Sequence, residues 1–193
     1  YWKEVNKMST IPEDFEPQSQ ASNYLRLTPG KHRIRILSEA VAGYEWWEDT
    51  PEGGRTPKRI PMDGRPPVEY AESVKKFLAF VVYNYETEKI QVLEISQASI
   101  QKELKAYEKD PDWGNLMDYD VEIERTGNDK NNTRYRVTSK PKADPSPQIV
   151  KEMEKGRPVL EALFKGADPF QYNPNAENVT EEEIKEIFKE EKK

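Results

Sequence analysis

The order of apolar and polar positions along the chain predicts a series of short β-strands. Residues 31–37 are KHRIRIL, in which Arg33 and Arg35 alternate with isoleucines, and this period of two is typical of a half-buried strand. Further strands are predicted at residues 40–48, 77–85, 90–95, 119–125 and 133–139, and the strand at 77–85 is expected to be central because both of its faces are apolar. The chain is therefore expected to be mainly β.

One helix is predicted inside this series, at residues 97–109. Its apolar positions Ile100, Leu104 and Tyr107 share one helical face, and Pro111 follows its end. Five or six strands with a single helix between the fourth and the fifth match an OB-like small β-barrel. The helix could equally close one end of a different small barrel. The expected fold is mainly β with helices, with the OB-like barrel as the specific prediction.

Composition divides the chain into three predicted parts. Residues 1–22 form an irregular, polar N-terminal arm, residues 23–142 hold the OB-like domain, and residues 143–193 form a proline-containing, acidic C-terminal segment. This last segment is expected to be extended and partly helical, at 147–165 and again from Thr180. The central part carries 20 basic and 20 acidic side chains, so the net charge of −6 lies in the two ends. An acidic end beside a neutral body is typical of interaction tails, although a tail that only aids solubility has the same composition.

A long irregular loop is predicted at residues 49–69, which contain five prolines and three glycines. Loops of this length are usually functional or disordered. This one also carries Arg55, Lys58 and Arg59. It is expected to be mobile without a ligand and to contribute cations to a binding site.

The aromatic residues provide candidate stacking platforms. Trp46 and Trp47 follow Tyr44 in a predicted strand, so the two tryptophans lie on opposite faces. One can be core while the other faces outward, unless loop and helix bury both. Stacking of a nucleic-acid base on an aromatic ring contributes about 1–3 kcal/mol. Tyr83 and Tyr85 lie near a hairpin end, where a core role and a stacking role are equally expected.

Several enzyme classes are disfavoured by residue content. The chain has no cysteine and one histidine, His32, which disfavours a thiolate zinc site and a serine–histidine–aspartate triad. No apolar run is long enough to span a membrane, so no membrane association is expected. No cofactor and no metal are expected either.

An acidic strand face is the one pattern that suggests a metal site. The four residues that share this face are Asp118, Asp120, Glu122 and Glu124. The next strand offers Arg134 and Arg136 on its corresponding face. Cross-strand charge pairing is the simpler explanation, and metal binding is the less favoured alternative.

Five stretches carry a resemblance to a known family. They are YLRLTPGKHRIRIL, GYEWWED, KKFLAFVVYNYETEKIQVLEISQASIQKELKAY, DPDWGNLMDYDVEIERTG and TRYRVTSKP, which span residues 24–141 in order. This pattern resembles the single-stranded DNA-binding proteins of tailed phages. The resemblance implies an OB-fold core, no enzymatic activity and a location in the cytoplasm of the infected bacterial host. Some phage relatives carry a structural zinc, which is not expected here.

The function expected from these observations is binding of single-stranded DNA without strong sequence preference, which would protect it during phage replication or recombination. The predicted contact residues are Arg33, Arg35, Tyr44, Trp46, Trp47, Arg55, Lys58, Arg59, Lys76, Tyr83 and Tyr85. Residues 177–193, with an apolar stripe of Ile184, Ile187 and Phe188 among glutamates, are expected to contact replication proteins, neighbouring copies or the DNA groove itself. The alternatives are a protein–protein interaction module of a phage replication or transcription complex, and a nuclease that requires Mg²⁺.

Overall fold

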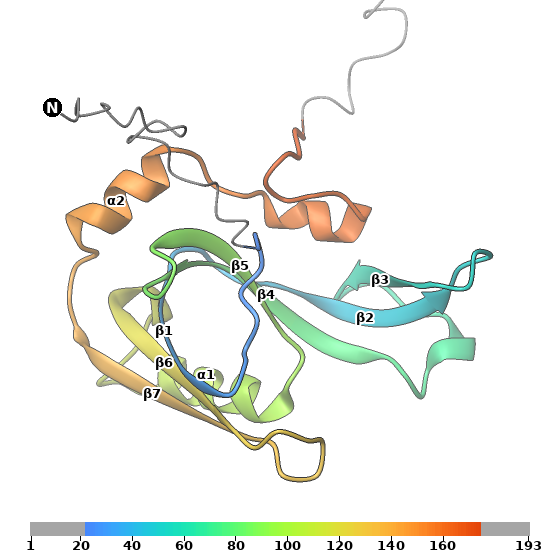
Figure 1. Ribbon diagram of the computed structural model, residues 1–193, viewed down its shortest axis with the longest axis horizontal. Coiled ribbons are helices and arrows are strands. Elements are labelled where there is room, and N and C mark those ends of the chain that lie inside the picture. The colour runs from blue at the N-terminus through green and yellow to red at the C-terminus, as the bar shows by residue number, and fades with distance from the viewer. Residues whose placement is uncertain (1–21, 175–193) are drawn as a thin grey trace, which may run out of the picture.

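The computed structural model describes residues 22–174, and within them seven strands form one antiparallel sheet (Figure 1). The strands are β1 (Gly30–Ile36), β2 (Val41–Asp49), β3 (Arg55–Pro61), β4 (Lys75–Asn84), β5 (Lys89–Ile95), β6 (Tyr119–Thr126) and β7 (Arg134–Lys142). The helices are α1 (Ala98–Lys109) and α2 (Pro147–Glu154), with 3₁₀ turns η1 (Val68–Tyr70), η2 (Leu116–Asp118) and η3 (Leu160–Lys165). The mainly β prediction is confirmed, and so is the helix between the strands.

The sheet is not closed into a barrel. Its strand order is β3-β2-β4-β1-β6-β7, with β5 on the other edge of β4. At the free edge of β7, α1 satisfies the backbone instead of another strand. The Val137 N–H donates to Glu103 Oε2 at 2.5 Å, and Tyr107 Oη donates to the Val137 carbonyl at 3.4 Å. The expected OB-like barrel is therefore observed only as an open β-sheet with a helix against its edge.

Strand β4 is the centre of the sheet, because β1 and β2 both pair with one of its edges. Tyr83 is the Cα partner of Arg35 in β1, whereas Lys76 is the partner of Tyr44 in β2. Alternate side chains of β4 supply two apolar clusters. Phe80 belongs to the inner cluster beside α1, and Phe77 belongs to the outer cluster on the opposite face.

Helix α2 and η3 cover the outer face of β4 (Figure 1). Ile149 of α2 is fully buried, and Leu160 and Leu163 of η3 are nearly so. Burying three large aliphatic side chains stabilises this arrangement by roughly 5–9 kcal/mol as an upper estimate. The weak helix predicted at 147–165 is thus two short elements, separated at Gly156. The helix predicted from Thr180 lies outside the described residues, as does almost all of the N-terminal arm.

The irregular loop predicted at residues 49–69 is partly wrong, because it contains β3. This strand pairs with β2 along its whole length, from Asp49↔Arg55 to Gly43↔Pro61. Proline lacks the N–H that every residue of a central strand donates to one neighbour or the other. β3 lies at the end of the strand order and has a neighbour on one side only, so proline is tolerated where the N–H would face away from it. The polar, proline-containing sequence of an edge strand hides the period that identified the other strands.

Candidate nucleic-acid interface

The predicted contact residues separate into two groups in space. One group lies on the β2–β3 hairpin and the adjacent end of β4, and comprises Tyr44, Trp46, Trp47, Arg55, Lys58, Arg59 and Lys76. The other lies where β1, β4 and β6 meet, and comprises Arg33, Arg35, Tyr83 and Tyr85. Figure 1 shows the hairpin extending away from β6 and β7. The two groups therefore have different neighbours.

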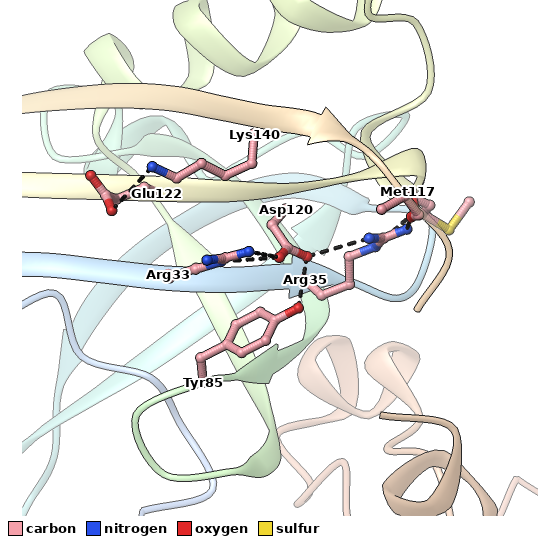
Figure 2. Close-up of polar contacts among 8 residues, drawn as sticks. Arg33, Arg35, Tyr85, Met117, Asp120, Glu122 and Lys140 are labelled. Carbon is pink, nitrogen blue, oxygen red and sulfur yellow. Dashed lines mark hydrogen bonds and ion pairs between the residues drawn. The ribbon is translucent and has the colours of Figure 1, made fainter. Parts of the chain in front are cut away.

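Asp120 of β6 organises the second group (Figure 2). Its carboxylate accepts hydrogen bonds from Arg33 Nε and Nη2 at 3.0 and 2.7 Å. It also accepts from Arg35 Nη1 at 3.3 Å and from Tyr85 Oη at 2.9 Å. The Asp120 side chain is 8% exposed, so a carboxylate that would be costly to bury alone is satisfied by three donor groups. We call these four residues the Asp120 network.

Arg35 is fully engaged in this network and cannot reach a phosphate. Its side chain is 3% exposed. Besides Asp120, it donates from Nε to the Met117 carbonyl at 3.0 Å and from Nη2 to the Ala143 carbonyl at 2.5 Å. The phosphate contact predicted for Arg35 is thus replaced by a link between β1, η2 and the end of β7.

Arg33 and Tyr85 are partly exposed, but each is held by Asp120. The Arg33 guanidinium lies 4.9 Å from the centre of the Tyr85 ring, and the hydrogen bond to Asp120 raises the pKa of Arg33. Burial, reinforced by the hydrogen bond to Asp120, raises the pKa of Tyr85 to about 12. Tyr83 is buried, with its ring edge-on to that of Tyr85 at 5.1 Å. Tyr83 lies in the outer cluster beneath α2 and offers no free ring face for stacking.

Cross-strand charge pairing accounts for part of the acidic face of β6, but its partners come mainly from β1. Glu122 pairs with Lys31 of β1 and Lys140 of β7, both at 3.5 Å. The predicted partners Arg134 and Arg136 form no ion pair with residues of the described part. Within residues 22–174, no group of three acidic or histidine residues is arranged to hold a metal ion.

The hairpin separates the two adjacent tryptophans. Trp46 is 5% exposed, donates from Nε1 to Glu48 Oε1 at 2.9 Å and stacks on Tyr70 of η1 with ring centres 6.4 Å apart. Trp47 points to the opposite face and is 45% exposed. Of the two tryptophans, Trp47 is therefore the one that presents its ring to solvent.

The cations of the hairpin differ in whether they form buried ion pairs within the fold. Arg59 donates to Glu45 at 2.8 Å and to Glu94 at 2.9 Å and is largely buried. Burial raises the pKa of Glu94, and the nearby Arg59 opposes that shift. Arg55 lies 3.5 Å from Asp49 with both side chains exposed, which is a weak pair.

Lys58 and Lys76 form no ion pair with any residue of the described part. Lys58 is the Cα partner of Trp46, and Lys76 is the partner of Tyr44. Strand alternation puts Tyr44, Lys58 and Lys76 on the same side of the sheet. We call these three residues the hairpin face.

An open cleft of about 620 Å³ lies beside the hairpin face. Its lining comes from the β1–β2 connection, β2, the β3–η1 connection, β4, α1 and η2, and includes Lys76, Met62 and Lys105. The sequence analysis did not identify this cleft. Its walls come from segments far apart in the chain, and no local pattern brings them together.

No protein-family model, curated protein or solved structure matches this chain. None of the helices in residues 22–174 is long and apolar enough to cross a membrane.

Proposed function

We propose that this protein binds single-stranded DNA without strong sequence preference, and that the β2–β3 hairpin is the contact surface. The observation that carries the proposal is a hairpin with unused groups on both faces, the exposed Trp47 on one and Lys58 with the neighbouring Lys76 on the other. Aromatic rings and cations on one element are what single strands require, because every base has a π-face and every nucleotide has a phosphate.

The strand pairing supports an OB-like arrangement as part of this proposal. β1 pairs with both β4 and β6, β4 and β5 form a hairpin, and α1 connects β5 to the β6–β7 hairpin. In this interpretation the β2–β3 hairpin is an extension of the first connection, a position that contacts nucleic acid in OB folds.

The proposed binding is not catalytic. Trp47 stacks on bases, and Arg55, Lys58 and Lys76 contact phosphates. β3 lies at the end of the strand order, so a flexible single strand can cross this edge and contact both faces of the hairpin. Such a protein would protect single strands during phage replication or recombination in the host cytoplasm.

The test is a tryptophan fluorescence titration of the full chain with oligo-dT at several salt concentrations. The double variant Lys58→Ala/Lys76→Ala should bind more weakly. The slope of log K against log salt concentration should become shallower by about 1.4, because each phosphate contact on a single strand contributes about 0.7. The matched control is Lys130→Ala/Lys151→Ala, which removes two exposed lysines outside the hairpin and should keep the wild-type slope.

Other outcomes would replace the proposal. Equal or tighter binding to duplex DNA of the same length would exclude a single-strand function. Cleavage of the oligonucleotide that depends on Mg²⁺ would indicate the nuclease alternative. Absence of salt-sensitive binding to any oligonucleotide would favour the protein–protein interaction module.

A further inference from the structure

The cleft beside the hairpin face has walls suited to a flat apolar group. Apolar side chains from several elements line it, among them Met62, Leu78, Leu116 and Met117. Met62 is 42% exposed and lies between β3 and η1. An exposed methionine is flexible and polarisable, and adapts to ligands of different shape.

The charges of the cleft argue against a phosphate as its occupant. Lys76 and Lys105 line it together with Glu39 and Glu108, so its own charge sums to zero at neutral pH. The carboxylates of Glu39 and Glu108 would repel a phosphodiester here, whereas they would not repel a neutral base. Phosphates are better placed outside the cleft, at Lys58 and at the ammonium group of Lys76.

Two amide side chains add hydrogen-bonding groups to the lining. Gln101 donates from Nε2 to the carbonyls of Lys76 and Ile95 at 3.0 and 2.8 Å. This leaves its Oε1 as an acceptor without a partner among the described residues. Asn115 accepts the Met117 N–H at 2.9 Å, which leaves its amide nitrogen as a donor. Base edges carry both donors and acceptors.

We propose that this cleft receives an unstacked base of the single strand whose phosphates lie on Lys58 and Lys76. The inference rests on the proposed function and specifies where a base goes next to the hairpin face. The base lies against the apolar side chains, and Gln101 and Asn115 contact its edge. Bases inside a duplex are paired and stacked, so they cannot enter without the cost of unstacking. The cleft thereby selects single strands over duplexes.

The methionines provide a direct measurement on the wild-type full chain. The sequence contains four. Met62 and Met117 line the cleft, whereas Met153 belongs to the outer cluster on the other side of the sheet. With methyl-labelled methionine, oligo-dT should shift the NMR signals of Met62 and Met117 and leave that of Met153 unchanged. An abasic oligonucleotide of the same length should leave all three unchanged, because it has phosphates but no bases.

A blocking variant tests the same point by affinity. Ala40 lines the cleft and is exposed, so Ala40→Trp should fill it without disturbing the core. Affinity for oligo-dT should fall by about 5- to 150-fold, the range expected for one lost base contact. Affinity for the abasic oligonucleotide should not change. Ala98→Trp is the matched control, because Ala98 is exposed at the start of α1 and does not line the cleft.

The outcomes separate this inference from the function on which it rests. If Lys58→Ala/Lys76→Ala weakens binding but Met62 and Met117 do not respond and Ala40→Trp is neutral, the base contact is wrong and the single-strand function stands. Equal methyl shifts with the abasic oligonucleotide would also overturn it. If oligo-dT does not bind at all, both proposals fall. Methyl shifts caused only by an apolar peptide would assign the cleft to a protein partner.

Discussion

The Asp120 network and the hairpin face contain the same kinds of side chain, cations beside aromatic rings, yet folding uses them differently. Arg35 is in β1, which has β4 on one side and β6 on the other. The β6 strand supplies the Asp120 carboxylate that binds Arg35. Lys58 is in β3, which has a neighbour on one side only. Arg59 is in the same edge strand but points to the opposite face, where Glu45 and Glu94 hold it. Position in the sheet and the face to which the side chain points, more than residue type, therefore decide which cations remain free for a ligand.

The largest effect is expected at Asp120. Asp120→Ala leaves the buried Arg35 guanidinium without its carboxylate, and breaking a buried pair in this way costs about 3–5 kcal/mol of unfolding free energy. Urea denaturation measures it. Glu124→Ala is the control on the same face of β6, has no ion pair within residues 22–174, and should change stability by less than about 0.5 kcal/mol. Equal losses for the two variants would mean that the network does not support the fold.

The second largest effect is expected for helix α2, which covers the outer face of β4. Ile149→Ala should cost about 2–5 kcal/mol of unfolding free energy, as expected for a buried isoleucine, while exposed Val150→Ala should be nearly neutral. The affinity of Ile149→Ala for oligo-dT should stay at the wild-type value. Tighter binding by this variant would show that α2 competes with DNA for the outer face, and the hairpin would no longer be the main contact.

Trp47 should affect binding without affecting stability. Trp47→Ala removes a half-exposed ring and should weaken oligo-dT binding by about 1–3 kcal/mol. Trp47→Phe keeps an aromatic face and should retain part of the affinity. Filter binding is the suitable measurement, since the variants change the fluorescence. An unchanged affinity for Trp47→Ala would remove this face of the hairpin from the site.

The smallest effect concerns pH and Tyr85. Its pKa is raised from 10.0 to about 12, chiefly by burial and then by Asp120. The folded-state value lies above the unfolded one, so this contribution to stability is complete below pH 10 and is lost as the pH rises through about 12. Wild type should lose more stability than Tyr85→Phe over this window. Tyr119, whose pKa burial also raises to about 12, is present in both proteins and does not affect the comparison. If the unfolding free energies of wild type and Tyr85→Phe change with pH in parallel, Tyr85 has the same pKa in the folded and the unfolded chain.

Local patterns were sufficient for much of the fold. Alternation identified β1, an apolar run with both faces apolar identified β4, and a period near 3.6 identified α1, because each of these elements packs in the core. The same signal is absent from β3, whose side chains are mostly exposed. Its two prolines suggested a loop, and only pairing with β2 makes it a strand.

The sequence alone could not show which cations form ion pairs within the fold and which remain free. Arg33 and Asp120 are 87 positions apart, and no local rule states that β1 and β6 are neighbours. Strand alternation put Trp46 and Trp47 on opposite faces, but the position of η1 decided that Trp46 is the covered one. The sequence by itself determined the elements that have a face in the core, and it identified which side chains are candidates for a nucleic-acid site. The tertiary structure decided which of those side chains remain free, because that depends on neighbours brought together by long-range strand pairing.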